Sequence, residues 1–324
     1  DPTEPQAHYR SEAPHSQANS QRTREEALTV VILGSGVQGT LFGVRLARAG
    51  HSVTLVARAK RAAELRAQGA AIRNAITGRS DTVYLPVFER LASDTQADLC
   101  FVLVRREQID EALPDLRAAC GIERIVLMVS HANGSDGLFA VLGRKRVVLG
   151  FPSVAGSIKN GIDVYVDVAE QRTIIEQTAP DIAVLLRTAG FRVQLVSDVD
   201  SWLKRHTVFV TAVGGALYQK KGDSGLLSSD KKLVRTFIFA VREGWSALDG
   251  RGVGIFCWVP LPLAVLYWCH FFRSARGEYY FARHTRHAPR ELAALVADVR
   301  ALVLNHETPH LQVLYGAIDR QCEQ

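Results

Sequence analysis

Cysteine is scarce in this sequence, and the few cysteines present form no recognisable framework. The five cysteines include no CxxC pair, and most of them lie in apolar runs. This pattern argues against a small scaffold held together by disulfides, so we expect reduced, buried thiols in a cytoplasmic protein. The cysteines are Cys100, Cys120, Cys257, Cys269 and Cys322.

Long apolar runs and basic stripes are also missing. The one apolar stretch of nearly membrane-spanning length, residues 255–272, is interrupted by Pro260 and Pro262 and contains His270. We therefore expect no membrane span but a buried helix that starts near Pro262. The net charge is +6, but the basic residues are scattered without interleaved aromatics, which argues against a nucleic-acid partner. An anionic cofactor and a carboxylate substrate would account for the positive charge.

The order of the predicted elements suggests two domains in the 324 residues. Residues 1–27 are polar and lack an apolar core, so we expect a flexible tail and no signal peptide. Between residues 28 and 197, short apolar strands alternate with helices, which is the doubly wound α/β pattern. After Ser197 long helical patterns take over. The sequence thus predicts a Rossmann-type domain over 28–197, followed by an all-α domain over 198–324.

The clearest motif lies in residues 28–58. A buried apolar strand is followed by Gly34, Gly36 and Gly39 in GxGxxG spacing, then by a helix that ends near Gly50 and by a second strand. Glycine permits the tight turn, the approach of a pyrophosphate to the backbone and close helix–strand packing at these three positions. A glycine-rich turn without a ligand is the alternative. The expected cofactor-binding residues here are Gly34, Ser35, Gly36, Val37, Gln38 and Gly39, at a helix N-terminus that favours anions.

The end of the second strand bears on the choice of cofactor. An NAD site usually has Asp or Glu there, but this strand ends at Arg58, and no carboxylate follows before Glu64. A guanidinium suits the 2′-phosphate of NADP(H), so Arg58 is an expected cofactor-binding residue. A solvated basic turn is the alternative explanation.

Two polar residues follow later predicted strands. Arg105 comes after the strand near 98–104, and Asn133 after the strand 124–129. Ligands of open α/β sheets bind beyond the carboxyl ends of the strands, so either residue could contact cofactor or substrate, or simply belong to a loop. The remaining elements are an irregular strand and turn over 70–87, a β-pair of 162–168 with 172–176, and helices over 202–218, 229–248, 262–272, 288–304 and 309–320.

The motifs together resemble the ketopantoate reductase family. They are the glycine unit followed by an arginine, the Asp98–Gln108 segment with its basic residue, an Asn-Gly pair and a Trp-x-Lys, in that order. The resemblance implies an NADPH-dependent reductase of a 2-oxo acid, with Lys204 as general acid and Asn133 as a cofactor-contacting residue of the active site. It also implies that Arg105 is the basic residue after the fourth strand.

The sequence departs from the family pattern at several positions. Val208 and Ala212 stand where asparagines are usual, four and eight residues beyond Lys204, so we expect a more apolar pocket and a substrate other than ketopantoate. The family's late glutamate has no clear match, and Glu307 or His310 lies nearest. Gly214 and Gly215 inside the same helix suggest that backbone or cofactor approaches closely. The usual serine of the preceding helix appears as Ala293 or Ala294.

Two other interpretations compete with a carbonyl reductase. His306 to His310 spell HExxH, a zinc-protease pattern, but Pro309 breaks the helix that this chemistry needs, so we expect no metal. The missing polar residues also allow an NADP(H)-binding protein without turnover, such as a redox sensor or an interaction module. The aromatic residues between Trp258 and Phe281 form core, a pocket wall or the surface of a homodimer.

Overall fold

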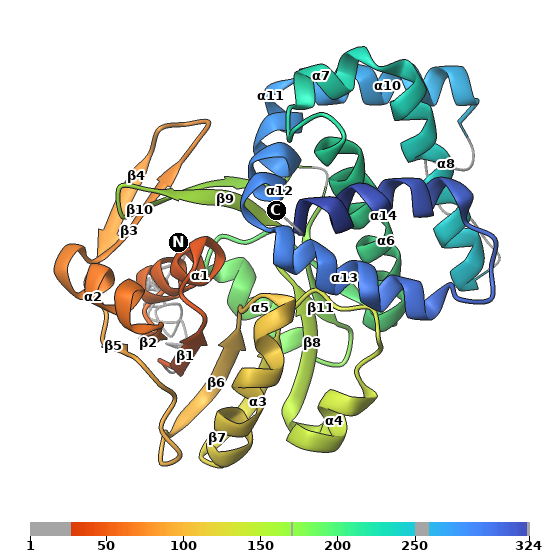
Figure 1. Ribbon diagram of the computed structural model, residues 1–324. Helices are drawn as coiled ribbons and strands as arrows, with labels where there is room; N and C mark the ends of the chain where they lie inside the picture. The colour runs from red at the N-terminus through yellow and green to blue at the C-terminus, as the bar shows by residue number, and fades with distance from the viewer. Residues whose placement is uncertain (1–26, 170, 250–258, 323–324) are drawn as a thin grey trace, which may run out of the picture.

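The computed structural model describes residues 27–169, 171–249 and 259–322. The tail expected over residues 1–27 lies outside them, apart from Ala27. Figure 1 shows two parts of the fold, a layered α/β part and a group of helices that follows it in the chain.

The large sheet has eight strands in the order β12-β11-β8-β7-β6-β1-β2-β5. All neighbouring strands are parallel except β11 and β8. Strand β1 lies between β2 and β6, pairing Val30 with Val53 and with Leu99. The chain first builds the sheet on one side of β1, with β2 and β5, and then on the other side, beginning with β6. Open α/β sheets bind ligands at such a change of direction, beyond the carboxyl ends of the strands. The strands are β1 (Thr29–Leu33), β2 (Ser52–Val56), β5 (Val87–Phe88), β6 (Ala97–Val102), β7 (Ile122–Leu127), β8 (Val147–Phe151), β11 (Thr173–Glu176) and β12 (Val193–Val196).

Helices cover the sheet and bury its apolar runs. The core contains Ile32, Leu41 and Phe101, all fully buried. The helix expected after the glycines is α1, which ends at Arg48, two residues before Gly50. The helices of this part are α1 (Val37–Arg48), α2 (Ala59–Gln68), α3 (Ile109–Ala118) after a short 3₁₀ turn η1 (Arg106–Gln108), α4 (Asp136–Leu142) and α5 (Pro180–Thr188), with a second 3₁₀ turn η2 (Arg144–Arg146).

A second sheet of four strands lies over helix α1 (Figure 1). Its order is β4-β3-β10-β9, and its outer pairs are antiparallel. Strands β9 and β10 form a hairpin whose turn is Asn160-Gly161, both with positive φ, the combination that a two-residue hairpin turn favours. The strands are β3 (Ala70–Asn74), β4 (Ser80–Val83), β9 (Val154–Lys159) and β10 (Ile162–Asp167).

This sheet corrects two sequence predictions. Residues 70–87 are not irregular, because β3 and β4 form a regular hairpin. The predicted pairing of 162–168 with 172–176 is wrong, because β10 pairs with β9 and β3, whereas β11 pairs with β8 and β12. The two segments follow each other closely in the chain but lie in different sheets.

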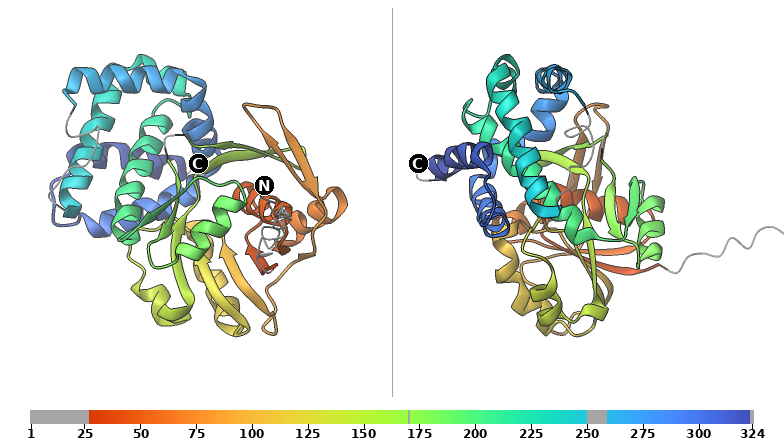
Figure 2. Two further views of the ribbon diagram at one scale, coloured as in Figure 1. Left: turned by 180° about the vertical axis from the view of Figure 1, so that it is seen from behind. Right: turned by 90° about the vertical axis from the view of Figure 1, so that its right-hand side faces the viewer.

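After β12 the described elements are all helical. Figures 1 and 2 show these helices packed on one another at one side of the large sheet. Gly215 of α6 has no room for a side chain, because a Cβ there would lie 2.8 Å from the Leu314 carbonyl carbon of α14. The close approach expected at this helix is therefore confirmed, and a neighbouring backbone makes it. The helices are α6 (Val199–Tyr218), α7 (Ser224–Ser229), α8 (Lys231–Asp249), α10 (Leu261–Arg273), α11 (Ala275–Gly277), the π-turn η3 (Glu278–Ala282), α12 (Arg283–His287), α13 (Pro289–Leu302) and α14 (Pro309–Cys322).

Helix α10 is the described part of the apolar stretch 255–272, and it starts at Leu261, close to the predicted position. It is not buried all round. Trp268 and Phe272 pack into the helical core, whereas Leu263 and Leu266 are more than half exposed. Among the described residues no helix has both the length and the apolar character that crossing a bilayer requires.

Candidate functional site

The glycine turn has the geometry of a phosphate cradle. Gly34 has φ of +99°, and a Cβ there would lie 2.7 Å from the Leu103 carbonyl oxygen. A Cβ on Gly39 would run into the carbonyl oxygen of Gly34, so only glycine lets α1 start this close to the strand. Gly36 is exposed, and a Cβ there would meet no atom within 4 Å. The open side of the turn is thus the side from which a pyrophosphate would approach.

The N-terminus of α1 is free to bind an anion. Gly36 caps it without a side-chain hydrogen bond, and no acidic residue lies in the first turn. The first N–H groups and the positive end of the helix dipole therefore face the open side of the turn. Ser35 points the other way, because its buried hydroxyl donates to the Val56 carbonyl oxygen at 3.1 Å. Its only possible contribution to a ligand is through the backbone.

Arg61 supports the glycine turn on the side away from the open face, a role that the sequence did not indicate. Its guanidinium donates to the Ser35 carbonyl oxygen at 3.1 Å and to the Thr40 hydroxyl at 3.2 Å. It also forms an ion pair with Asp163 of β10, whose carboxylate is fully buried. Burial raises the pKa of Asp163 to about 6, against the opposing effect of the Arg61 charge. The second sheet therefore holds the turn in place.

Arg58, the residue predicted from the sequence to bind a 2′-phosphate, is exposed at the end of β2. It follows β2 as the N-cap residue of α2, with an extended backbone and an exposed side chain. With the residues that the structure describes, its guanidinium makes neither a hydrogen bond nor an ion pair. Arg58 thus differs from Arg61, whose charge is already neutralised.

A cavity of about 150 Å³ lies between the α/β part and the helices, and we call it the central cavity. It begins at the glycine turn, because Gln38 lines it. From the carboxyl edge of the large sheet come Val104, Ser130 and Phe151, which follow or end β6, β7 and β8. The opposite wall consists mainly of apolar side chains from α6, η3 and α13. These are Phe209, Val210, Val213, Tyr280, Phe281 and Leu295, with the polar residues His206, Thr285 and Glu291 among them.

Helix α6 turns a different face to this cavity than the resemblance implies. His206, Val210 and Val213 line it at helical spacing. Lys204 is not among the lining residues; it precedes His206 by two positions, which is about 200° around the helix. The Lys204 ammonium instead helps to lower the pKa of Asp198, although hydrogen bonds from Ser201 lower that pKa more.

The face that carries Lys204 packs against other helices. Val208 and Ala212 are fully buried there, and Val208 lies against Gly244 of α8. The prediction that Val208 and Ala212 make the pocket apolar is therefore wrong, because neither residue lines the central cavity. The pocket is nevertheless apolar, because Phe209, Val210 and Val213 line it instead.

Arg105 and Asn133 both reach the helical half. The Arg105 guanidinium lies 3.9 Å from the Glu291 carboxylate and 3.5 Å from the His287 carbonyl oxygen. The Asn133 amide donates to Asp298 of α13 at 2.7 Å. Asn133 does not line the central cavity, and its amide nitrogen is already engaged, so its expected contact with a cofactor would need a change of partner. Arg106, which follows Arg105 in the chain and was not among the predicted site residues, forms a bidentate pair with the Asp298 carboxylate at 2.8 and 3.2 Å.

The HExxH segment does not form a zinc-protease helix. Pro309 begins α14, so His306 lies in the preceding loop and only His310 is helical. His310 pairs with Glu243, whose carboxylate also accepts the backbone N–H groups of His310 and Leu311. Across the residues described, no cluster of three His, Cys, Asp or Glu side chains is arranged to hold a metal ion. Glu307 lies in the same loop and does not line the central cavity.

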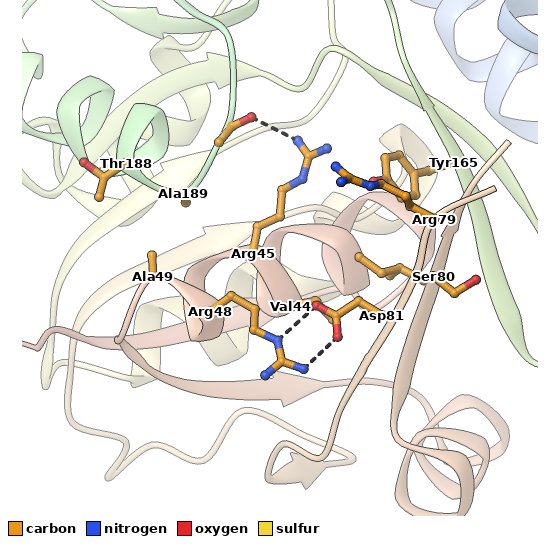
Figure 3. A pocket seen from close by; sticks show the side chains of 12 residues that line it. Val44, Arg45, Arg48, Ala49, Arg79, Ser80, Asp81, Tyr165, Thr188 and Ala189 are labelled. Carbon is orange, nitrogen blue, oxygen red and sulfur yellow. Dashed lines mark hydrogen bonds and ion pairs between the residues drawn. The ribbon is translucent and has the colours of Figure 1, made fainter. Parts of the chain in front are cut away.

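A larger hollow of about 460 Å³ lies at the C-terminal half of α1 (Figure 3). Its arginines are largely neutralised. Arg48 forms two hydrogen bonds with Asp81, and Arg45 pairs with Asp167 at 2.9 Å. Arg79 adds one exposed guanidinium. The hollow has neither the glycine turn nor the strand ends that mark the central cavity, so we take the central cavity as the candidate active site.

Solved structures share this fold. A PanE/ApbA family ketopantoate reductase from Ralstonia eutropha is 20% identical, with a TM-score of 0.70 over 90% of this chain and 97% of that chain. A 2-dehydropantoate 2-reductase from Geobacter metallireducens is 15% identical, with a TM-score of 0.72 over 91% and 100%. A D-mandelate dehydrogenase with NADH and anilino(oxo)acetate is 12% identical, with a TM-score of 0.69 over 90% and 98%. At these identities the likeness is one of fold.

The sequence also matches a family model. Residues 30–179, from β1 to the residue before α5, match the family model described as ketopantoate reductase PanE/ApbA. With this match and the glycine turn, the protein is an NAD(P)-dependent oxidoreductase that acts on a ketone or the corresponding alcohol. More narrowly, residues 30–179 belong to the ketopantoate reductase family, which confirms the resemblance seen in the motifs of this part of the chain.

Proposed function

We propose that the protein uses NADPH to reduce a 2-oxo acid, or a related ketone, to the hydroxy compound in the central cavity. The observation that carries the proposal is that one cavity joins the glycine turn, through Gln38, to the carboxyl edge of the sheet and to helix α6. A bound NADPH would supply the hydride. The chain's own residues would hold the phosphates at the turn and the carbonyl compound beside α6.

The cofactor preference rests on Arg58. Its exposed guanidinium follows β2 and forms no ion pair with a described residue, so it can bind the 2′-phosphate without first losing a partner. Arg61 is excluded from this role by its ion pair with Asp163.

The substrate would be a carboxylate with an apolar substituent. Phe151, Phe209 and Phe281 give the cavity an aromatic wall, which favours a bulky apolar group over a hydroxylated one. Arg105 stands beside Glu291, a cavity residue, and could bind the carboxylate. A relative of the same fold was solved with anilino(oxo)acetate, a 2-oxo acid derivative that carries an aromatic group.

The test is a screen of NADPH and NADH oxidation, followed by absorbance, against 2-oxo acids that range from ketopantoate to phenylglyoxylate. We expect the highest kcat/KM with NADPH and a bulky apolar 2-oxo acid. Efficient turnover of ketopantoate would contradict the substrate preference. Binding of NADPH without reduction of any carbonyl would contradict the function and favour the alternative of a cofactor-binding protein without turnover. The homodimer and the cytoplasmic location stay predictions. The general-acid role implied for Lys204 also stays a prediction, although Lys204 does not line the central cavity.

A further inference from the structure

His206 presents an imidazole ring to the central cavity. The ring stacks on Trp202, with centroids 4.9 Å apart and an interplanar angle of 11°, and its centroid lies 4.3 Å from that of Phe151. The two aromatic rings fix its orientation. With the residues that the structure describes, the ring nitrogens form no hydrogen bond. A polar group that lines a cavity and has no protein partner is placed to bind a ligand.

Few other groups in this cavity could supply a proton. Glu291 and Tyr280 are the other titratable side chains that line it. The Glu291 carboxylate faces Arg105, and the Tyr280 hydroxyl accepts a hydrogen bond from the Ala169 backbone N–H at 3.2 Å. Gln38, Ser130 and the remaining polar lining residues do not titrate in the neutral range.

We propose that His206, in place of Lys204, is the catalytic residue that donates the proton to the ketone oxygen during reduction. The inference rests on the proposed function. The carbonyl carbon gains the hydride, the oxygen keeps the electron pair of the broken π bond, and the His206 imidazolium transfers its ring proton to that oxygen. The products are the hydroxy acid, NADP⁺ and neutral imidazole, which regains a proton from water.

The charges near the His206 ring favour its protonation when the substrate binds. Burial lowers the pKa of His206 to about 3, so the ring is neutral near pH 7. The carboxylate of a 2-oxo acid would bring a negative charge into the cavity, in addition to Glu291, and nearby negative charge favours the imidazolium. Arg105, whose guanidinium lies 3.9 Å from the Glu291 carboxylate, can offset one of these two carboxylates, which leaves one negative charge in the cavity. The substrate would thus help to protonate its own acid.

Kinetics of His206→Gln, compared with wild type, test the role directly. Because a positioned general acid contributes about 10²–10⁴-fold, we expect kcat to fall at least about 100-fold with little change in KM. The matched control is His270→Gln, an exposed histidine on α10 away from the cavity, which should keep wild-type kcat. Wild-type kcat in His206→Gln would overturn the role of His206. A fall in kcat of about 100-fold in Lys204→Ala or Tyr280→Phe, together with an active His206→Gln, would overturn it as well.

A second measurement needs no turnover. In protein with ¹⁵N-labelled histidine, the ring signals of His206 are those that disappear in His206→Gln. We expect oxamate, an unreactive analogue of a 2-oxo acid, to shift these signals and to raise the pH at which they titrate. Signals unchanged by saturating oxamate would overturn the proposal. A wild type that reduces no carbonyl would instead show that the proposed function fails, and thermal unfolding would show whether each variant is folded.

Discussion

At the scale of single residues, the glycines of the turn have separable tasks. Gly39 is required by packing, because the Gly34 carbonyl oxygen occupies the place of its Cβ. Gly36 is required only if a ligand approaches, because its own surroundings are open. The same motif therefore contains one position that tests stability and one that tests binding.

We expect Gly39→Ala to lower the free energy of unfolding by about 3 kcal/mol, since a methyl group there must displace backbone. Gly36→Ala should change it by less than about 0.5 kcal/mol and should still weaken NADPH binding at least about tenfold, because its methyl group would stand in the path of the pyrophosphate. Urea unfolding and NADPH fluorescence titration measure the two effects. A folded Gly36→Ala with wild-type affinity would argue against a cofactor at this turn.

The Arg58 side chain gives a test of cofactor choice. Loss of one charge-assisted contact with a phosphate typically costs about 1.5–3 kcal/mol, so Arg58→Ala should raise KM for NADPH about 10–100-fold and leave KM for NADH almost unchanged. Arg117→Ala, at an exposed arginine of α3, is the control for loss of positive charge. Equal effects on both cofactors would refute the assignment of Arg58 to the 2′-phosphate.

At the scale of elements, α6 connects the two halves through opposite faces. One face lines the central cavity, and the other packs on α8 and α14. Its two adjacent glycines meet different neighbours. A Cβ on Gly215 would contact α14 backbone, whereas a Cβ on Gly214 would contact the flexible end of Leu292 at 3.0 Å.

Alanine at these two positions should therefore have unequal effects. Gly215→Ala has to push α14 away and should cost about 2–3 kcal/mol. In Gly214→Ala, a shift of Leu292 relieves the contact, and the gain of about 1 kcal/mol in helix propensity offsets the remaining strain. Thermal unfolding of both variants gives the comparison. Equal destabilisation would mean that α14 does not pack as closely on α6 as described.

The elements also show what the sequence could and could not predict. The unit β1–α1–β2 was predictable because its signals are local: an apolar strand, three glycines and a cap. The hairpin β9–β10 had an equally local signal, Asn160-Gly161, which we missed. The pairing of β10 with β3 and that of β11 with β8 join segments far apart in the chain, and neighbouring sequence does not reveal them. The face of α6 that meets the cavity depends on packing against α8 and α14, so motif spacing led to Lys204 and missed His206.

At the scale of the whole molecule, a small polar cluster joins the two halves. Asp298 of α13 is nearly buried and binds Arg106 and Asn133 from the ends of β6 and β7. Removing one member of a buried ion pair typically costs about 3–5 kcal/mol. Asp298→Asn should therefore lower the free energy of unfolding by roughly that amount. In contrast, Asp319→Asn, which removes the half-exposed pair with Arg300, should cost less than about 1 kcal/mol.

The stability of the whole chain should also depend on pH through His206. Its folded pKa of about 3 lies below the ordinary value of 6.5, so the unfolded chain binds more protons between these pH values. Stability from this group is present above pH 6.5 and is lost as the pH falls, by about 2 kcal/mol at pH 5. Asp163, with its raised pKa, contributes with the opposite sign between about pH 4 and 6. Urea unfolding at pH 7 and pH 5 should show a smaller acid loss in His206→Gln than in wild type; an equal loss would contradict the low pKa.

The hairpin β9–β10 determines how small a working nucleotide-binding fragment can be. Asp163 and the Gly161 carbonyl oxygen hold Arg61 against the glycine turn. The Val154 carbonyl oxygen accepts a hydrogen bond from the side-chain amide of Gln38, which belongs to the turn. All three contacts come from chain that follows the first five strands by many residues. A recombinant piece that stops after β7 would keep the whole glycine motif and lose its supports, so a transplantable version of this module has to extend at least through residue 167.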